Sequence, residues 1–299
     1  MSQTEIQVSN QVNVKHPKPS SQWWETLKKL RKQKSAMIGG AIILFFILLA
    51  VLAPLLTSVS YKEGVLENRF LAPMTQGHFF GTDDLGRDLF TRIIYGAQIS
   101  LRVGFLSVIG SIIVGTILGL LAGYYGKWVD MLVSRAFDIM LAFPSILLAI
   151  AIVTILGRSL TNALIAIAII NIPTYGRLVR SKVLSLKEEE FIIAAKAIGM
   201  KNNRIIFQHV LPNSMTPIIV QGTLGIATAI IEAAALGFLG LGAVPPTPEW
   251  GTMLADSKDY IQMAPWTVIF PGISIMLVVL GFNLFGDGLR DALDPKMKQ

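Results

Sequence analysis

The ionisable residues that lie in or beside long apolar runs are the first candidates for chemistry in this sequence. Glu232, Arg102 and Asp138 are in such positions, and a charge within a membrane-spanning helix is costly enough to mark a functional site or a paired structural contact. Glu232 follows Pro212 by about 30 Å of helix, which is close to the full thickness of the hydrocarbon core. We therefore expect Glu232 near the outer end of its helix, where it either binds an ammonium group or pairs with an arginine such as Arg102. Asp138 and Arg102 lie nearer to the ends of their runs, where a charge can reach water.

Several other chemistries are excluded by composition. The chain has no cysteine, and its three histidines are scattered, so the sequence offers neither a thiolate nucleophile nor a metal-ligand cluster. A phosphate-binding loop is also absent, because the Gly126-Lys127 pair lacks the earlier glycine, with Leu121 at that place. No nucleophile, base and orienting group can be identified. We expect a non-catalytic chain that binds no cofactor itself.

The elements that would position the charged residues are membrane-spanning helices. Hydrophobic residues make up 53% of the chain and charged residues 15%, compared with about 25% charged residues in soluble domains. The predicted fold class is an all-α membrane protein with six transmembrane helices, the fourth ending at Pro173. The predicted spans are 36–57, 101–124, 136–156, 160–174, 213–240 and 265–286.

Small residues recur every four positions in two of the predicted spans. At this spacing they share one helix face and let two helix backbones approach closely in lipid. We expect these faces to pack within the chain. The two sets are Ser111, Gly115, Gly119 and Gly123 in the second span, and Ala229, Ala233 and Gly237 in the fifth.

The distribution of positive charge predicts the orientation in the membrane. Most of the 26 Lys and Arg residues lie in the N-terminal arm, in loops 125–135 and 174–212, and in the C-terminal tail. Because positive loops stay in the cytoplasm, both termini are expected there. The net charge of +7 is therefore assigned to topology and not to nucleic-acid binding. The arm, residues 1–35, is expected to hold a basic interfacial helix over 22–34 that contacts membrane lipid.

The cytoplasmic loop 184–212 has the pattern of a helix, a turn and a second helix. It has an acidic start, two alanines that leave a shallow surface, a glycine that stops the first helix, Asn202 or Asn203 as the next N-cap, and a Leu-Pro pair that opens the following span. Spacing alone fits either an interfacial helix or a docking site for another protein. The candidate docking residues are Glu188, Glu189, Glu190, Ala194, Ala195, Gly199, Leu211 and Pro212.

This loop resembles the EAA loop of ABC-importer permeases. The two alanines, the glycine and the Leu-Pro pair match that pattern, whereas Ile193 replaces the family's glutamate, whose charge the preceding acidic residues could supply. Three further segments are similar to dipeptide and oligopeptide permeases of the C-subunit type. They are 81–101, 238–251 and 286–295.

The resemblance implies a type I ABC importer permease fold and a set of partners. These would be a second homologous permease, two ATPase subunits that carry ATP and Mg²⁺, an extracytoplasmic substrate-binding protein and a peptide cargo, in a bacterial inner membrane. Residues 58–96 and 241–264, with Trp250, Asp256 and Asp259, would face the binding protein. The core would run from 97 to 289 and the cytoplasmic tail from 290 to 299.

Three alternatives remain open from sequence, one of which is a membrane-bound scaffold or sensor that would tolerate loss of transport. A nickel-chelate or other solute importer would share these motifs, because the binding protein selects the cargo. A stand-alone secondary transporter driven by an ion gradient would leave the EAA-like loop without a role.

Overall fold

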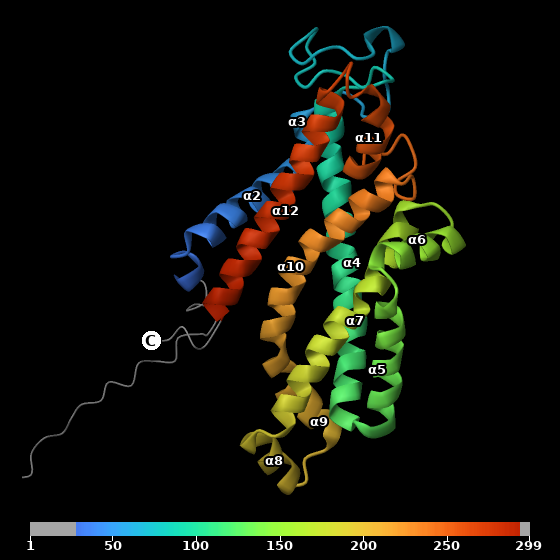
Figure 1. The fold of residues 1–299 in the computed structure, drawn as a ribbon. Helices are drawn as coiled ribbons and strands as arrows, with labels where there is room; N and C mark the ends of the chain where they lie inside the picture. The colour runs from blue at the N-terminus through green and yellow to red at the C-terminus, as the bar shows by residue number, and fades with distance from the viewer. Residues whose placement is uncertain (1–27, 294–299) are drawn as a thin grey trace, which may run out of the picture.

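The computed structural model describes residues 28–293, which form a bundle of long helices with a looped segment at one end (Figure 1). The first part of the basic helix expected over 22–34, residues 22–27, lies outside the described residues. Within them, residues 28–30 are helical and a turn follows. Helix α2 (Lys34–Val51) then begins, so Lys34 belongs to the first span.

The first two spans are joined by a segment of turns at one end of the bundle. Short helix α3 (Ala53–Leu56) ends the first span, and residues 57–88 contain a single 3₁₀ turn, η1 (Leu66–Asn68). Helix α4 (Leu89–Tyr125) begins twelve residues before the expected position. The side chain of Asp88 caps it by accepting a hydrogen bond from the Thr91 N–H at 2.8 Å. Hydropathy missed this first part because polar residues alternate there with buried apolar ones.

The third predicted span is two helices. Helices α5 (Lys127–Ala142) and α6 (Ser145–Leu156) meet at 95°. Phe143 is extended, with φ −95° and ψ 141°, because the ring of Pro144 disfavours the helical conformation in the preceding residue. The apolar run predicted a span correctly but carried no sign of the bend.

The fourth span continues through the proline that was expected to end it. Helix α7 runs over Leu160–Lys187, with Pro173 buried inside it. The expected end at residue 174 is wrong because a proline removes one helical hydrogen bond without stopping a helix whose two sides are held by neighbours.

The helix that holds α7 in place is α4. An added Cβ at Gly115 would lie 2.8 Å from the Ile172 carbonyl oxygen, and one at Gly119 would lie 2.5 Å from the Gly176 carbonyl oxygen. The hydroxyl of Ser111 donates to the Ala168 carbonyl at 2.8 Å. The backbones thus approach closely along three turns, and the expected packing of this small-residue face within the chain is confirmed.

The loop after α7 contains the short helix α8 (Glu190–Ala197) and then a turn. A continuous helical stretch follows, which consists of α9 (Asn202–Ile205), the wide π turn η2 (Ile206–Val210) and α10 (Leu211–Phe238). The fifth span therefore starts at its expected place as an α-helix but is preceded by nine helical residues.

The small residues of α10 pack on α11 (Trp250–Ser257). An added Cβ at Gly237 would meet the Glu249 carboxylate at 2.2 Å. Glu249 is buried and caps α11, accepting from the N–H groups of Gly251 and Thr252 at 2.8 Å each. Burial raises the pKa of Glu249, and these N–H donors oppose that rise.

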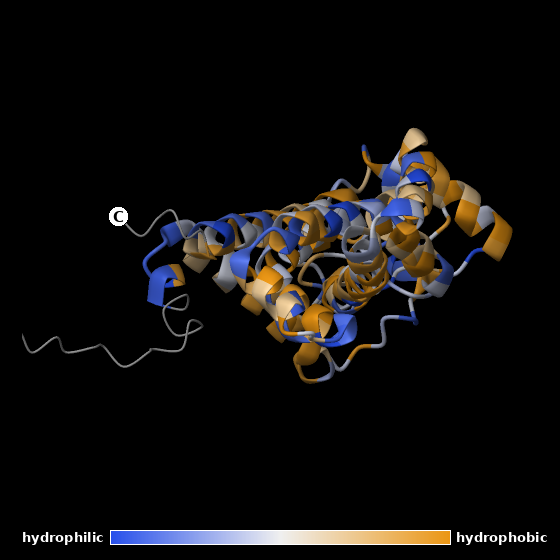
Figure 2. Ribbon diagram, turned by 90° about the horizontal axis from the view of Figure 1, so that it is seen from below, coloured by the Kyte–Doolittle hydropathy of each residue, from blue (hydrophilic) through white to orange (hydrophobic). Residues whose placement is uncertain are grey.

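The last helix, α12 (Trp266–Leu293), follows the 3₁₀ turn η3 (Lys258–Tyr260) and packs beside α2. An added Cβ at Gly39 would lie 2.6 Å from the Gly281 carbonyl oxygen. Five helices are long and apolar enough to cross a membrane, or six if α5 and α6 count as one span. Apolar residues predominate along the helices, while the described residues before α2, 28–33, are mostly hydrophilic (Figure 2). The expected six-segment, all-helical fold is confirmed for the described residues.

Gly119→Ala is predicted to destabilise the bundle by about 1–3 kcal/mol, because the new methyl group must push α7 away from α4. The measurement is thermal unfolding of the purified chain in detergent. Gly272→Ala is the control, since an added Cβ there meets nothing within 4 Å. Equal melting temperatures for the two variants would contradict the close packing.

Candidate functional site

Helix α8 lies at one end of the molecule, opposite segment 57–88 (Figure 1). Ile192 and Ala195 on its inner face are buried against the ends of α7 and α10. Its outer face is apolar but exposed, with Phe191 43%, Ile193 53% and Ile198 78% accessible to solvent. A helix with both faces apolar and one of them uncovered has the surface expected of a docking element.

Gly199 ends α8 as the spacing predicted. It has φ +78°, its N–H bonds to the Lys196 carbonyl, and the Met200 N–H bonds to the Ala195 carbonyl, both at 3.0 Å. This is the Schellman pattern, which favours glycine at the left-handed position. An added Cβ at Gly199 would meet nothing within 4 Å, so backbone conformation and not crowding explains the glycine.

The other candidate docking residues divide into exposed and buried groups. Glu188, Glu189 and Glu190 are all exposed, and Ala194 is exposed beside them. Ala195 faces the core, so the expectation that it contributes to an open surface is wrong. A short helix such as α8 is held by burying one face, and the boundary between its buried and exposed faces runs between Ala194 and Ala195.

The start of the next helix also departs from expectation in detail. Leu211 is half-buried and Pro212 exposed in the first turn of α10. The expected N-cap at Asn202 or Asn203 is wrong, because Lys201 holds that position. The Asn202 side chain instead accepts a hydrogen bond from the Tyr124 hydroxyl at 2.9 Å and so ties the loop to the end of α4.

The charges in the spans have partners that the sequence did not indicate. Glu232 accepts a hydrogen bond from the Asn171 amide at 2.8 Å, across α10 and α7. The expected pairing with Arg102 is wrong, since Arg102 is exposed on α4 and no ion pair to it is found within residues 28–293. Asp138 on α5 pairs with Arg177 at 2.6 Å and lies 4.0 Å from Arg135.

A second charged pair joins α5 to α7. Arg180 binds Asp130 with two nitrogens, one of them at 2.7 Å. Lys187, the last residue of α7, donates to the Tyr124 carbonyl at 3.1 Å. These contacts fix the ends of α4, α5 and α7 to one another where the chain enters α8.

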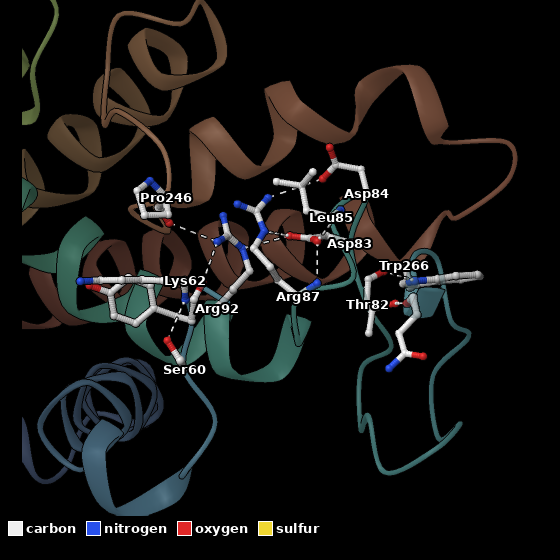
Figure 3. Close-up of polar contacts among 12 residues, drawn as sticks. Ser60, Lys62, Thr82, Asp83, Asp84, Leu85, Arg87, Arg92, Pro246 and Trp266 are labelled. Atoms are coloured by element: carbon white, nitrogen blue, oxygen red, sulfur yellow. Dashed lines mark hydrogen bonds and ion pairs between the residues drawn. The ribbon is translucent and has the colours of Figure 1, made fainter. Parts of the chain in front are cut away.

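At the opposite end a buried ionic network holds segment 57–88 in place (Figure 3). The Asp83 carboxylate lies 2.6 Å from Arg87 Nε and 3.3 Å from Arg92 Nε, and all three side chains are at most 5% exposed. Arg92 on α4 also donates to the carbonyls of Tyr61 and Pro246 at 3.1 and 3.2 Å. One α4 side chain therefore holds three segments that are far apart in sequence.

The packing around this network determines which residues at this end of the bundle are exposed to a partner. Trp250 is fully buried, and its indole N–H donates to the Ile93 carbonyl at 3.2 Å, so the expectation that it faces a partner is wrong. Asp256 is half-buried against the network, whereas Asp259 is exposed. Burial raises the pKa of Asp256, and repulsion from Asp84 adds to the rise.

Comparison with known proteins assigns this architecture to a class. Residues 115–299 match the family model of the binding-protein-dependent transport system inner membrane component. The chain belongs to this family of membrane permeases, and is therefore a transport subunit and not an enzyme. Residues 21–73 match the N-terminal transmembrane domain of oligopeptide transport permease C, which places the chain among the dipeptide and oligopeptide ABC permeases.

Its relatives cover almost the whole chain. It is 70% identical over 278 residues to the dipeptide transport system permease protein DppC of Alkalihalophilus pseudofirmus, covering 93% of this chain and 91% of that protein. It is 47% identical to the di/tripeptide permease DppC of Pseudomonas aeruginosa, covering 95% and 94%. It is 46% identical to the glutathione permease GsiD of Escherichia coli, covering 95% and 94%.

Solved structures agree on the fold. An inward-facing MetNI methionine ABC transporter has a TM-score of 0.54 and 19% identity, covering 68% of this chain and 97% of that chain. The expected ABC importer permease fold is confirmed by this match, and the family assignment excludes a stand-alone secondary transporter.

Asp256→Asn is predicted to raise the melting temperature at neutral pH, because a folded-state pKa above the ordinary 3.8 means that the ionised carboxylate destabilises the fold. Above 3.8 the folded state binds more protons than the unfolded state, so wild-type stability should rise as the pH falls from neutral toward that value. The variant should lose part of this rise. Thermal unfolding in detergent at neutral and mildly acidic pH measures both effects, with exposed Asp259→Asn as control. A lower melting temperature for Asp256→Asn at neutral pH would contradict the prediction.

Proposed function

We propose that this chain is one permease subunit of an ATP-driven importer for dipeptides or oligopeptides in a bacterial cytoplasmic membrane. It forms half of the translocation pathway with a second, homologous permease. Two ATPase subunits supply ATP and Mg²⁺, and an external binding protein delivers the cargo. This chain binds no cofactor of its own.

The proposed topology places α8 and both termini in the cytoplasm and residues 57–88 and 241–264 outside. Positive charge supports it, since Lys196, Lys201 and Arg204 lie in or beside the α8 end. The ionic network at the far end supports it too, because it gives the external segment a fixed shape against which a binding protein can seat.

The exposed apolar face of α8 is the observation that carries the proposal. Phe191, Ile193 and Ile198 form an uncovered surface at an end of the molecule where the neighbouring residues are charged. A shallow hollow lies beside it, lined by Ile198, Gly199, Met200, Lys201 and Arg204. A helix of this kind fits a groove on an ATPase subunit, where its apolar side chains would be desolvated.

The way α8 is attached allows motion of an ATPase to reach the spans. The hydrogen bond from Tyr124 to Asn202 and the bonds from Lys187 to the end of α4 join the loop to two long helices. Ile192 and Ala195 pack into the same cluster as Val183 and Val210. Displacement of α8 would therefore move the ends of α4, α7 and α10 together.

A peptide cargo is favoured by the names of the relatives. The proteins at 70% and 47% identity are named for dipeptide and di/tripeptide transport, and one at 46% is named for glutathione, itself a tripeptide. A nickel chelate remains the alternative cargo, but these names give it no support.

Ile198→Asp is predicted to reduce copurification of the ATPase subunits about tenfold, because docking would bury an uncompensated carboxylate. The side chain is 78% exposed in this chain, so the variant should fold normally. The measurement is affinity purification in detergent from cells that express the whole importer, with quantification of every copurified subunit.

Ile198→Leu is the matched control, since it keeps an apolar side chain at the same site. It should copurify the ATPases as the wild type does. If the wild-type chain is recovered without ATPases, or if Ile198→Asp recovers them in full, the docking proposal is incorrect.

A further inference from the structure

The carboxylate of Glu232 lies in the membrane-spanning part of the bundle without a cationic partner in the described residues. Its Oε2 accepts from Asn171 at 2.8 Å, and no ion pair to it is found within 28–293. The residue is half-buried, and its second oxygen is not among the fully buried atoms that lack a hydrogen-bond partner. A carboxylate at this depth is costly unless a positive group or a polar cavity compensates it.

Asn171 holds the carboxylate in a fixed orientation. Its amide nitrogen donates both to Glu232 and to the Ile167 carbonyl of its own helix, the latter at 3.0 Å. Both amide hydrogens are therefore committed, and the amide plane is locked between α7 and α10. The arrangement positions Glu232 without neutralising its charge.

The groups within one turn of this pair are also oxygen-bearing. Tyr175 follows Asn171 by one turn of α7, and Thr228 precedes Glu232 by one turn of α10. The Tyr175 hydroxyl is not beside the carboxylate, because the side chain is buried in the core and its oxygen lies against Gly225, two turns of α10 from Glu232. Thr228 is exposed, and its hydroxyl and the Glu232 carboxylate can each accept a hydrogen bond from an ammonium group, which has three donors.

The same faces of α7 and α10 stay polar toward the α8 end of the bundle. Thr174, Arg177 and Ser181 are exposed at one-turn intervals on α7. A hollow of about 410 Å³ beside α7 is lined mostly by apolar side chains, and its polar lining residues are Thr216 and Gln221 of α10 and Arg290 of α12. Exposed polar side chains at regular spacing are costly against lipid, so this face lines a water-filled space or a partner.

We propose that Glu232, positioned by Asn171, binds the α-ammonium group of the peptide during its passage, and that the exposed hydroxyl of Thr228 completes the site. This inference rests on the proposed function, because it assigns the substrate contact of that pathway. The charge order supports it: the polar face is anionic at Glu232, whereas Arg290 lies further along, and Arg177 is paired with Asp138. A zwitterionic peptide would meet its ammonium contact first and a cationic residue afterwards.

Glu232→Gln in the complete importer, reconstituted in proteoliposomes, tests the proposal. The amide keeps the size and can still accept from Asn171, so a purely structural role would be preserved. We expect at least a tenfold loss of labelled dipeptide uptake at saturating binding protein. Subunit copurification, melting temperature and binding-protein-stimulated ATP hydrolysis should stay at wild-type levels.

Two further variants separate charge from shape. Glu232→Asp keeps the negative charge and should retain a substantial part of the uptake lost in Glu232→Gln. Asp287→Asn makes the same chemical change at an exposed site on α12 and should leave uptake unchanged.

Uptake by Glu232→Gln within twofold of wild type would overturn the proposal, as would equal loss in the Gln and Asp variants. Loss of the second permease from Glu232→Gln preparations would also overturn it, because the carboxylate would then be paired with a partner subunit. Failure of the wild-type chain to copurify ATPases would instead remove the proposed function, and the wild-type preparation reports that outcome separately.

Discussion

The close packing of α4 against α7 is the contact on which the remaining structure depends. Gly115, Gly119 and Gly123 let the two backbones meet with almost no side chain between them. In lipid, where the hydrophobic effect does not drive helices together, such van der Waals contact replaces it. One end of this pair carries Arg92 and the ionic network, and the other end holds α9, which follows α8 in the loop, through Tyr124. Both candidate interaction surfaces are thus mounted on one helix pair.

Hydropathy and spacing predicted the number of spans, the fold class and the small-residue contact, because these depend on composition along single helices. They did not predict the bend at Phe143, the passage of α7 through Pro173 or the early start of α4. Each of these depends on neighbouring elements. A helix can continue through a proline where other helices pack against it, and polar residues can lie in the first turns of a long helix where other segments supply their hydrogen-bond partners.

The candidate site was predictable to the same extent. The glycine that ends α8 follows from local backbone geometry, so Gly199 was placed correctly. Local backbone geometry does not determine which face of α8 is buried, so the sequence placed Ala195 on the exposed face, whereas it is buried. The contact between Asn171 and Glu232, and the bonds from Arg92 to Tyr61 and Pro246, join residues that the sequence separates widely. Only the packed chain brings them together.

The length of α4 has a mechanical consequence. Its 37 residues extend about 55 Å, well beyond a hydrocarbon core of about 30 Å, and the loop that contains α8 is fastened near its far end through Asn202. A stiff helix of that length amplifies rotation. A rotation of α4 by about 5° about its Arg92 end would move its Tyr124 end by roughly 5 Å. The helix is thus a lever arm, in which small angular changes at one membrane face become ångström-scale strokes at the other.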